Sequence, residues 1–201
     1  MSPKQNRGNL THWALIAALT GLSAFGTILI RIPIPATTGY FNIGDVFVIW
    51  AGLWLGPAGG FVVGAIGPAI ADAIGFPQFI LATMVTKGIE GFVAGLIGKG
   101  GRGVGRKTIA AAVGSMMIVI GYFSFEAYIY PKLGRKIPFF AVTDIGAALV
   151  EILPNTIQAI IAAAVGVSLW RASSGYESRK MKDEDVSIDT KDQANRAEQK
   201  E

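Results

Sequence analysis

Long apolar runs, separated by short polar or proline-containing segments, fill this chain from about residue 12 to residue 172. Of its 201 residues, 51% are hydrophobic and only 16% are charged. A bilayer offers no water to the backbone, so apolar runs of this length are expected to cross it as helices. The sequence therefore predicts an all-α membrane protein, a bundle of six transmembrane helices.

The six spans are expected at about residues 12–30, 43–55, 57–75, 78–97, 108–130 and 140–170. The second is short for a hydrocarbon core of ~30 Å, which normally takes ~20 residues. A polar arm at residues 1–11 precedes the membrane domain at 12–172. Residues 173–201 are charged and nearly free of aromatic side chains, which predicts a disordered tail.

Lysine and arginine are distributed unequally between the two ends of these spans. An even number of spans puts both termini on one side, and the basic residues near the membrane on that side are Lys4, Arg7, Lys99, Arg102, Arg106, Lys107 and Arg171. Those on the other side are Arg31, Lys132, Arg135 and Lys136. The positive-inside rule therefore places both termini, and with them the tail, in the cytoplasm.

Every carboxylate outside the tail lies within, or at the mouth of, an apolar segment. These residues are Asp45, Asp72, Glu90, Glu126, Asp144 and Glu151. When the spans are threaded in alternation, all of them fall in the half of the bilayer that faces away from the cytoplasm. Charge at membrane depth is costly and usually faces the bundle interior, where it binds or conducts something. A single polar pocket open to the outside is predicted.

Two predicted helices carry polar faces. On the helix at 140–170, one face holds Asp144, Ala148, Glu151, Asn155, Gln158 and Ala162, at steps of three and four. On the helix at 78–97, Thr83, Lys87 and Glu90 share a face. Hydrogen bonding between helices, or neutralisation of Lys87 by the acids, is the structural alternative. Ligand binding is favoured because the acids outnumber Lys87.

The remaining candidates come from the helix at 108–130 and from the loop at 31–42. Glu126 follows Tyr122 by one turn, and Tyr40 is placed to stack on a flat ring. The loop is expected either to close the pocket as a lid or to act as a stiff connector, since two prolines restrict it. The predicted substrate-binding residues are Lys87, Glu90, Tyr122, Glu126, Glu151, Asn155, Tyr40 and Thr83.

Several activities have little support in the sequence. There is one histidine and no cysteine, so neither a metal nor another cofactor is expected. The nucleotide-binding pattern Gly-x-x-x-x-Gly-Lys-Ser/Thr is absent, which argues against ATP hydrolysis by that route. We expect no enzyme. A self-sufficient proton-coupled permease, with Glu90, Glu126 and Glu151 as a relay, is the alternative, although few polar residues continue that relay toward the cytoplasm.

Four segments in series resemble the S components of energy-coupling factor (ECF) transporters, the vitamin-binding membrane subunits of a class of prokaryotic ABC importers. They are Ile-Pro-Ile-Pro-Ala-Thr-Thr-Gly-Tyr-Phe-Asn-Ile-Gly-Asp at 32–45, Leu-Gly-Pro at 55–57, Ala-Ile-Ala-Asp at 69–72 and Lys-Gly-Ile-Glu-Gly at 87–91. The resemblance covers about residues 10–172. It implies a six-helix bundle in a prokaryotic plasma membrane, with a pocket near the outer surface closed by the first loop.

The resemblance also implies partners and a substrate class. The chain would capture a vitamin and deliver it inward with a transmembrane coupling subunit and two cytoplasmic ATPases. Small residues on the first helix, including Ala14 and Ala18, would dock onto the coupling subunit. An acceptor-rich pocket with one cation suits pyridoxine or hydroxymethylpyrimidine. Pantothenate would leave the acids poorly used, and riboflavin would need a larger pocket.

Overall fold

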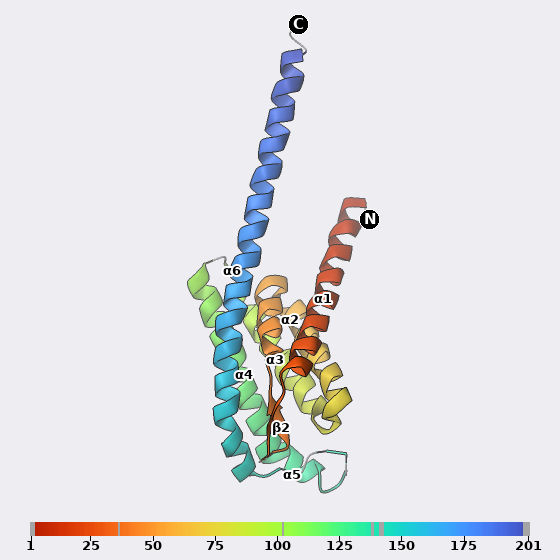
Figure 1. The fold of residues 1–201 in the computed structure, drawn as a ribbon, viewed down its shortest axis with the longest axis vertical. Helices are drawn as coiled ribbons and strands as arrows, with labels where there is room; N and C mark the ends of the chain where they lie inside the picture. Colours follow the sequence, from red (N-terminus) through yellow and green to blue (C-terminus); the bar gives the residue numbers. More distant parts are fainter. Residues whose placement is uncertain (1–2, 36, 102, 138, 141–142, 199–201) are drawn as a thin grey trace. The chain divides into compact units, whose positions relative to one another are not determined.

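The structure, a computed structural model, describes the backbone of residues 3–198 apart from residues 36, 102, 138 and 141–142. The chain divides into two compact units, residues 1–167 and 168–201. The first unit holds nearly all of the helices and the only strands of the described chain (Figure 1). In the second unit, residues 168–198 are helical.

The helices follow one another with short connections. Their bounds are α1 Pro3–Leu29, α2 Asp45–Gly75, α3 Ile80–Gly98, α4 Val104–Ser124, α5 Tyr130–Leu133 and α6 Ile145–Glu198. A 3₁₀ turn, η1 Pro77–Phe79, precedes α3, and a π-helical turn, η2 Phe125–Ile129, joins α4 to α5. Within the described residues, five helical segments are long and apolar enough to cross a membrane. The all-α prediction is thus confirmed in part, since the described chain is mostly helical but also contains two short strands, whereas the six crossings and the side of the termini stay predictions.

The helix α2 is interrupted at Gly56, whose φ of 82° and ψ of −172° lie in a region that is essentially restricted to glycine. A Cβ built on Gly60 would lie 2.7 Å from the Cα of Gly52. Eight residues of a straight helix would separate those positions by ~12 Å. The two arms of α2, residues 45–55 and 57–75, therefore lie side by side as a helical hairpin. They correspond to the second and third predicted helices.

Glycines also bring the α2 arms close to α3. A Cβ on Gly52 would come within 2.5 Å of the backbone oxygen of Gly91, and one on Gly95 would come within 2.5 Å of the nitrogen of Pro57. Side chains at these positions would force the helices apart. The small residues let the backbones meet, as expected where helices pack in a membrane.

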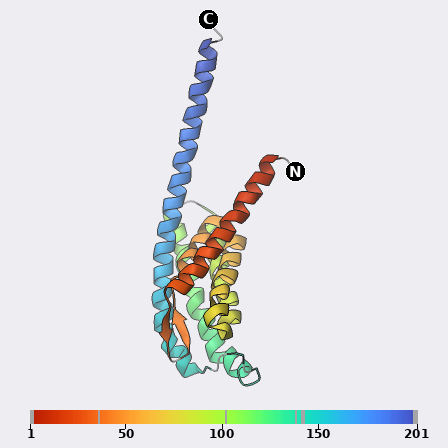
Figure 2. The ribbon, with the colours of Figure 1, turned by 45° about the vertical axis from the view of Figure 1, so that its right-hand side comes forward.

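The loop between α1 and α2 contains a short β-hairpin, formed by β1 Ile32–Ile34 and β2 Gly39–Phe41 (Figure 2). The strands are antiparallel, with Ile32 opposite Phe41 and Pro33 opposite Tyr40. Proline is acceptable here because neither strand has a second neighbour that would need its missing N–H. The loop is therefore an ordered element, and we refer to it as the β1–β2 hairpin.

Both ends of the described chain are helical. The backbone of α6 stays helical to Glu198, where a disordered tail was expected from Ser173. At the other end, α1 already begins at Pro3, inside the predicted polar arm. Residues 173–201 include four Lys, four Glu and two Arg, which have high intrinsic helix propensity and favour a helical backbone.

Candidate functional site

A small cavity lies where the β1–β2 hairpin meets α3, α4, η2 and α6. It encloses about 20 Å³, slightly more than a single water molecule needs. Its walls are formed by Gly39, Tyr40, Asn42, Phe79, Thr83, Tyr122, Glu126, Glu151 and Asn155. Polar side chains from distant parts of the sequence thus converge on one point.

Most of the predicted binding residues reach this cavity. Those that line it are Tyr40, Thr83, Tyr122, Glu126, Glu151 and Asn155. Lys87 and Glu90 do not belong to its lining, although both are fully buried on the same helix as Thr83. Both share the α3 face of Thr83 but lie one and two turns farther along the helix. At that distance along α3 they are beyond the end of the cavity.

Lys87 is held by an ion pair instead. Its ammonium nitrogen lies 2.7 Å from a carboxylate oxygen of Asp45, and neither side chain is more than 1% exposed. Lys87 also donates to the Oδ1 of Asn42 over 3.3 Å, and Gln158 donates to Asp45. Structural neutralisation, the alternative interpretation of Lys87, is what the geometry supports.

Asn42 connects the elements beneath the cavity. Its side-chain oxygen accepts a hydrogen bond from the backbone N–H of Gly44 over 2.9 Å, and its own backbone N–H donates to Gln158 over 2.7 Å. The hydroxyl of Thr27 in α1 also reaches the same Asn42 oxygen, at 3.4 Å. One asparagine therefore ties the end of the hairpin to α1, α2, α3 and α6.

The β1–β2 hairpin contacts the acidic part of the cavity directly. The hydroxyl of Thr37 donates to Glu151, and the backbone N–H of Gly39 donates to the hydroxyl of Thr37 over 3.2 Å. A Cβ on Gly39 would come within 2.5 Å of a Glu151 carboxylate oxygen. The hairpin thus closes the cavity with almost no spare room.

Tyr40 connects the β1–β2 hairpin to α2. Its hydroxyl donates to Asp72, and the guanidinium of Arg31 lies 5.2 Å from the centre of its ring. Burial raises the pKa of Tyr40, and the Asp72 carboxylate adds to that shift. The phenol therefore stays protonated and keeps its role as a donor to Asp72.

Glu126 and Glu151 lie next to each other in the cavity wall. Glu151 accepts from Thr37 and from the Asn155 amide, the latter over 3.4 Å. No donor in the described part of the chain reaches either carboxylate oxygen of Glu126. Two like charges in contact repel, so this pair needs a proton or a cation between its members.

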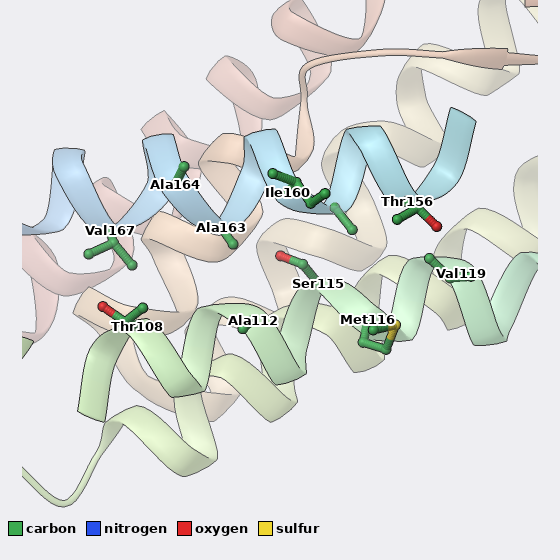
Figure 3. A pocket seen from close by; sticks show the side chains of 11 residues that line it. Thr108, Ala112, Ser115, Met116, Val119, Thr156, Ile160, Ala163, Ala164 and Val167 are labelled. Atoms are coloured by element: carbon green, nitrogen blue, oxygen red, sulfur yellow. The ribbon is translucent and has the colours of Figure 1, made fainter. Parts of the chain in front are cut away.

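A larger cavity of about 500 Å³ lies between α4 and α6 (Figure 3). Its walls are mainly alanine, valine, isoleucine and methionine, with hydroxyl groups from Thr108, Ser115 and Thr156 and no charged side chain. A polar ligand would find few partners there. In addition, no group of His, Cys, Asp and Glu that could hold a metal occurs among the described residues. The small acidic cavity is therefore the candidate site.

The model of one protein family, the ECF-type riboflavin transporter S component, matches residues 5–174. The chain belongs to this family. A Pyrococcus woesei protein, described as an uncharacterized protein in a gap 3′ region, is 39% identical over 114 residues, which cover 57% of this chain and 77% of that protein. A solved S component of a bacterial ECF transporter shares the fold, with a TM-score of 0.65 at 17% identity over 84% of this chain and 98% of that one.

Family membership agrees with the resemblance found in the sequence and makes this S component part of a transporter family, not of an enzyme family. Its apolar helices accordingly belong in a membrane. The family's description names riboflavin, whereas the sequence favoured pyridoxine or hydroxymethylpyrimidine.

On α1 of this S component, the small residues form part of the outer surface. Ala14 and Ala18 are exposed, whereas Ile16 and Leu19 are buried against the rest of the unit. Ala14 and Ala18, which we call the docking ridge, therefore lie on the face of α1 that does not pack against the rest of the unit.

Sequence reasoning missed three residues of the cavity wall: Gly39, Asn42 and Phe79. Gly39 and Asn42 stand within the segment 32–45, whose resemblance to the family was the available signal. Phe79 carried no such signal in the sequence. It is the last residue of the proline-containing turn η1, directly before α3.

Proposed function

We propose that this S component captures a small vitamin or vitamin precursor from outside a prokaryotic plasma membrane. It then passes the molecule inward together with a transmembrane coupling subunit and two ATPases. The observation that carries the proposal is the acid-lined cavity beneath the β1–β2 hairpin, where Glu126 and Glu151 meet from different elements. Such a closed, polar site suits capture by binding, and the chain has no nucleotide-binding motif of its own.

The proposed topology has six crossings with both termini in the cytoplasm. The two arms of α2 would count as separate crossings, although the arm at 45–55 contains only 11 residues and spans ~16 Å as a helix. The buried Asp45–Lys87 pair at the start of this arm would then lie inside the protein, away from lipid. The excess of Lys and Arg on the terminal side supports this orientation.

For the substrate, we favour pyridoxine or hydroxymethylpyrimidine over riboflavin, which the family's description names. The cavity of about 20 Å³ is smaller than any of these molecules, so the β1–β2 hairpin has to withdraw before one can enter. A small ring needs the least withdrawal. Its hydroxyl or amine donors would meet Glu126, Glu151 and Asn155, and its flat face would meet Tyr40 and Phe79.

Binding and uptake measurements test this function. Purified S component should bind one of these vitamins tightly in a calorimeter, and mass spectrometry should find the same molecule in protein purified from its natural host. Vesicles that contain the S component alone should show no uptake until the coupling subunit and ATPases are added. Uptake by the S component alone would instead favour the proton-coupled permease.

The contribution of the cavity is tested with one substitution. Glu151→Gln removes an acceptor charge from the wall and should weaken binding by about tenfold or more, because hydrogen bonds to charged groups are the stronger ones. Asp144→Asn is the matched control, since Asp144 is an exposed acid that directly precedes the same helix. Equal affinity of the Glu151→Gln variant and the unmodified protein would remove Glu151 from the site.

A further inference from the structure

The cavity of this S component carries a pair of acids and no basic side chain in its wall. Glu126 and Glu151 both line it, and the residues that share its wall with them are neutral: glycine, tyrosine, asparagine, phenylalanine and threonine. Both carboxyl groups are nearly inaccessible, with 1% exposure for Glu126 and 4% for Glu151. Water therefore does little to screen the charge.

The nearby cations are engaged elsewhere. Lys87 lies 2.7 Å from Asp45 and is absent from the cavity wall. Arg31 donates to the backbone oxygens of Ala71, over 2.6 Å, and Thr27, over 3.2 Å. Neither residue lines the cavity, so no basic side chain in its wall pairs with Glu126 or Glu151.

The other titratable groups around the cavity do not change this balance. From the hairpin and α4 come the neutral phenols of Tyr40 and Tyr122, and Tyr130 of α5 donates to the backbone oxygen of Gln78. From α2 comes Asp72, which adds negative charge behind Tyr40. Glu90 of α3 is a further buried acid. The surroundings are therefore acidic on balance.

We infer that this S component binds its substrate as a ring-nitrogen cation, a protonated pyridine or aminopyrimidine, whose N–H is held by the Glu126–Glu151 pair. The inference rests on the proposed function and narrows its substrate class. A cation placed between the two carboxyl groups removes their mutual repulsion and supplies the donor that Glu126 lacks. An unprotonated ring nitrogen has no hydrogen to donate to that buried acceptor, and an anion is repelled.

The rest of the cavity wall suits such a ring. The aromatic side chains of Tyr40 and Phe79 line the cavity, and aromatic rings attract a flat cation as well as a flat hydrocarbon. The hydroxyl groups of Thr83 and Tyr122 lie 2.9 Å apart and can exchange hydrogen bonds with hydroxyl groups on the ring. The charge of the ring nitrogen would thus be recognised by the acids of α6 and η2. The hydroxyl substituents of the ring would be recognised by Thr83 of α3 and Tyr122 of α4.

A pair of isosteric probes tests the inference on the unmodified full-length protein. Pyridoxine carries the ring nitrogen, and its benzene analogue has a C–H in that position and cannot become a cation. Calorimetry should show that pyridoxine binds at least about tenfold more tightly than the benzene analogue, as expected for one charge-assisted hydrogen bond in a buried site. The same comparison is made with hydroxymethylpyrimidine and its benzene analogue.

Substitutions of the acidic pair then locate the effect. In the Glu126→Gln and Glu151→Gln variants, the ratio of the affinity for pyridoxine to that for its benzene analogue should fall toward one. In the Asp144→Asn variant, this ratio should stay as in the unmodified protein. Two single variants are used so that poor folding of one leaves the other informative, and the ratio does not depend on the active fraction of the sample.

The outcomes separate this inference from the proposed function. Equal affinity for both members of a pair, or tight binding of neutral riboflavin that Glu126→Gln leaves unchanged, would overturn the cation inference while the S component function stands. Absence of binding to all of these probes, in a protein that transports nothing with its coupling subunits, would overturn both.

Discussion

Lys87 and Asp45 show how a charge is accommodated at membrane depth. Each is fully buried, and each finds in the other the countercharge that the bilayer cannot supply. Replacement of one partner leaves the other charge uncompensated, which typically costs about 3–5 kcal/mol, whereas replacement of both by neutral groups is often tolerated. The pair is therefore expected to contribute specificity of packing more than net stability.

We predict that Lys87→Met lowers the midpoint of thermal unfolding in detergent more than the double variant Lys87→Met/Asp45→Asn does. In the double variant no charge stays behind, and Gln158 can still hydrogen-bond the amide at position 45. Unfolding is followed by circular dichroism at the same protein and detergent concentrations. Losses that simply add up in the double variant would show that the two charges do not depend on each other.

Single residues also explain why Glu126 reaches the cavity. It lies in the π-helical turn η2, where five residues at 125–129 replace the regular α-helical path. Such turns are often found at functional sites because they redirect a side chain. Thr143 donates to the backbone oxygen of Glu126 over 2.7 Å and so holds this turn. The sequence of the turn contains no proline or glycine that would have revealed it.

Among the elements, the β1–β2 hairpin lies against the cavity. Gly39 brings its backbone against Glu151, with room for no additional carbon. We predict that Gly39→Val keeps the hairpin from seating and weakens vitamin binding by about tenfold or more, mainly through faster dissociation. Stopped-flow fluorescence measures both rate constants.

The control for this experiment is Gly103→Val, in a different loop of the same protein. A Cβ at Gly103 meets nothing within 4 Å, and its φ of −67° is open to any residue. This control variant should keep the dissociation rate constant of the unmodified protein. A Gly39→Val protein with unchanged dissociation would show that the hairpin does not hold the ligand in place.

At the scale of the whole molecule, the exposed face of α1 is the predicted contact with the coupling subunit. We predict that Ala14→Trp/Ala18→Trp abolishes uptake by the assembled transporter but leaves vitamin affinity unchanged, because bulky side chains prevent close helix approach far from the cavity. Uptake is measured in vesicles that contain all subunits, and affinity by calorimetry on the S component alone.

A matched pair of substitutions controls for bulk alone. Leu149 and Leu153 have the same spacing on α6 and are also exposed, at 55% and 68%. Tryptophan at both of these positions should leave uptake intact. If affinity is lost in the Ala14/Ala18 variant, or if both variants stop uptake equally, the ridge is not a specific docking surface.

The periodicity of α6 was the most reliable guide to the site. Ala148, Glu151, Asn155, Gln158 and Ala162 were predicted on one face, and all five are buried. A helix repeats every 3.6 residues, so the shared face follows from spacing alone. Asp144, at the start of this series, is exposed because α6 begins only at Ile145.

The sequence by itself determined the membrane class, the helical segments and the acids that turn inward, because composition and periodicity are local properties of the chain. Only the tertiary structure decided which acids meet. It paired Lys87 with Asp45, placed Glu126 beside Glu151, and seated Gly39 over the cavity. Those contacts join residues far apart in the chain, and they depend on how far each helix is rotated and where the backbone breaks, which no local pattern specifies.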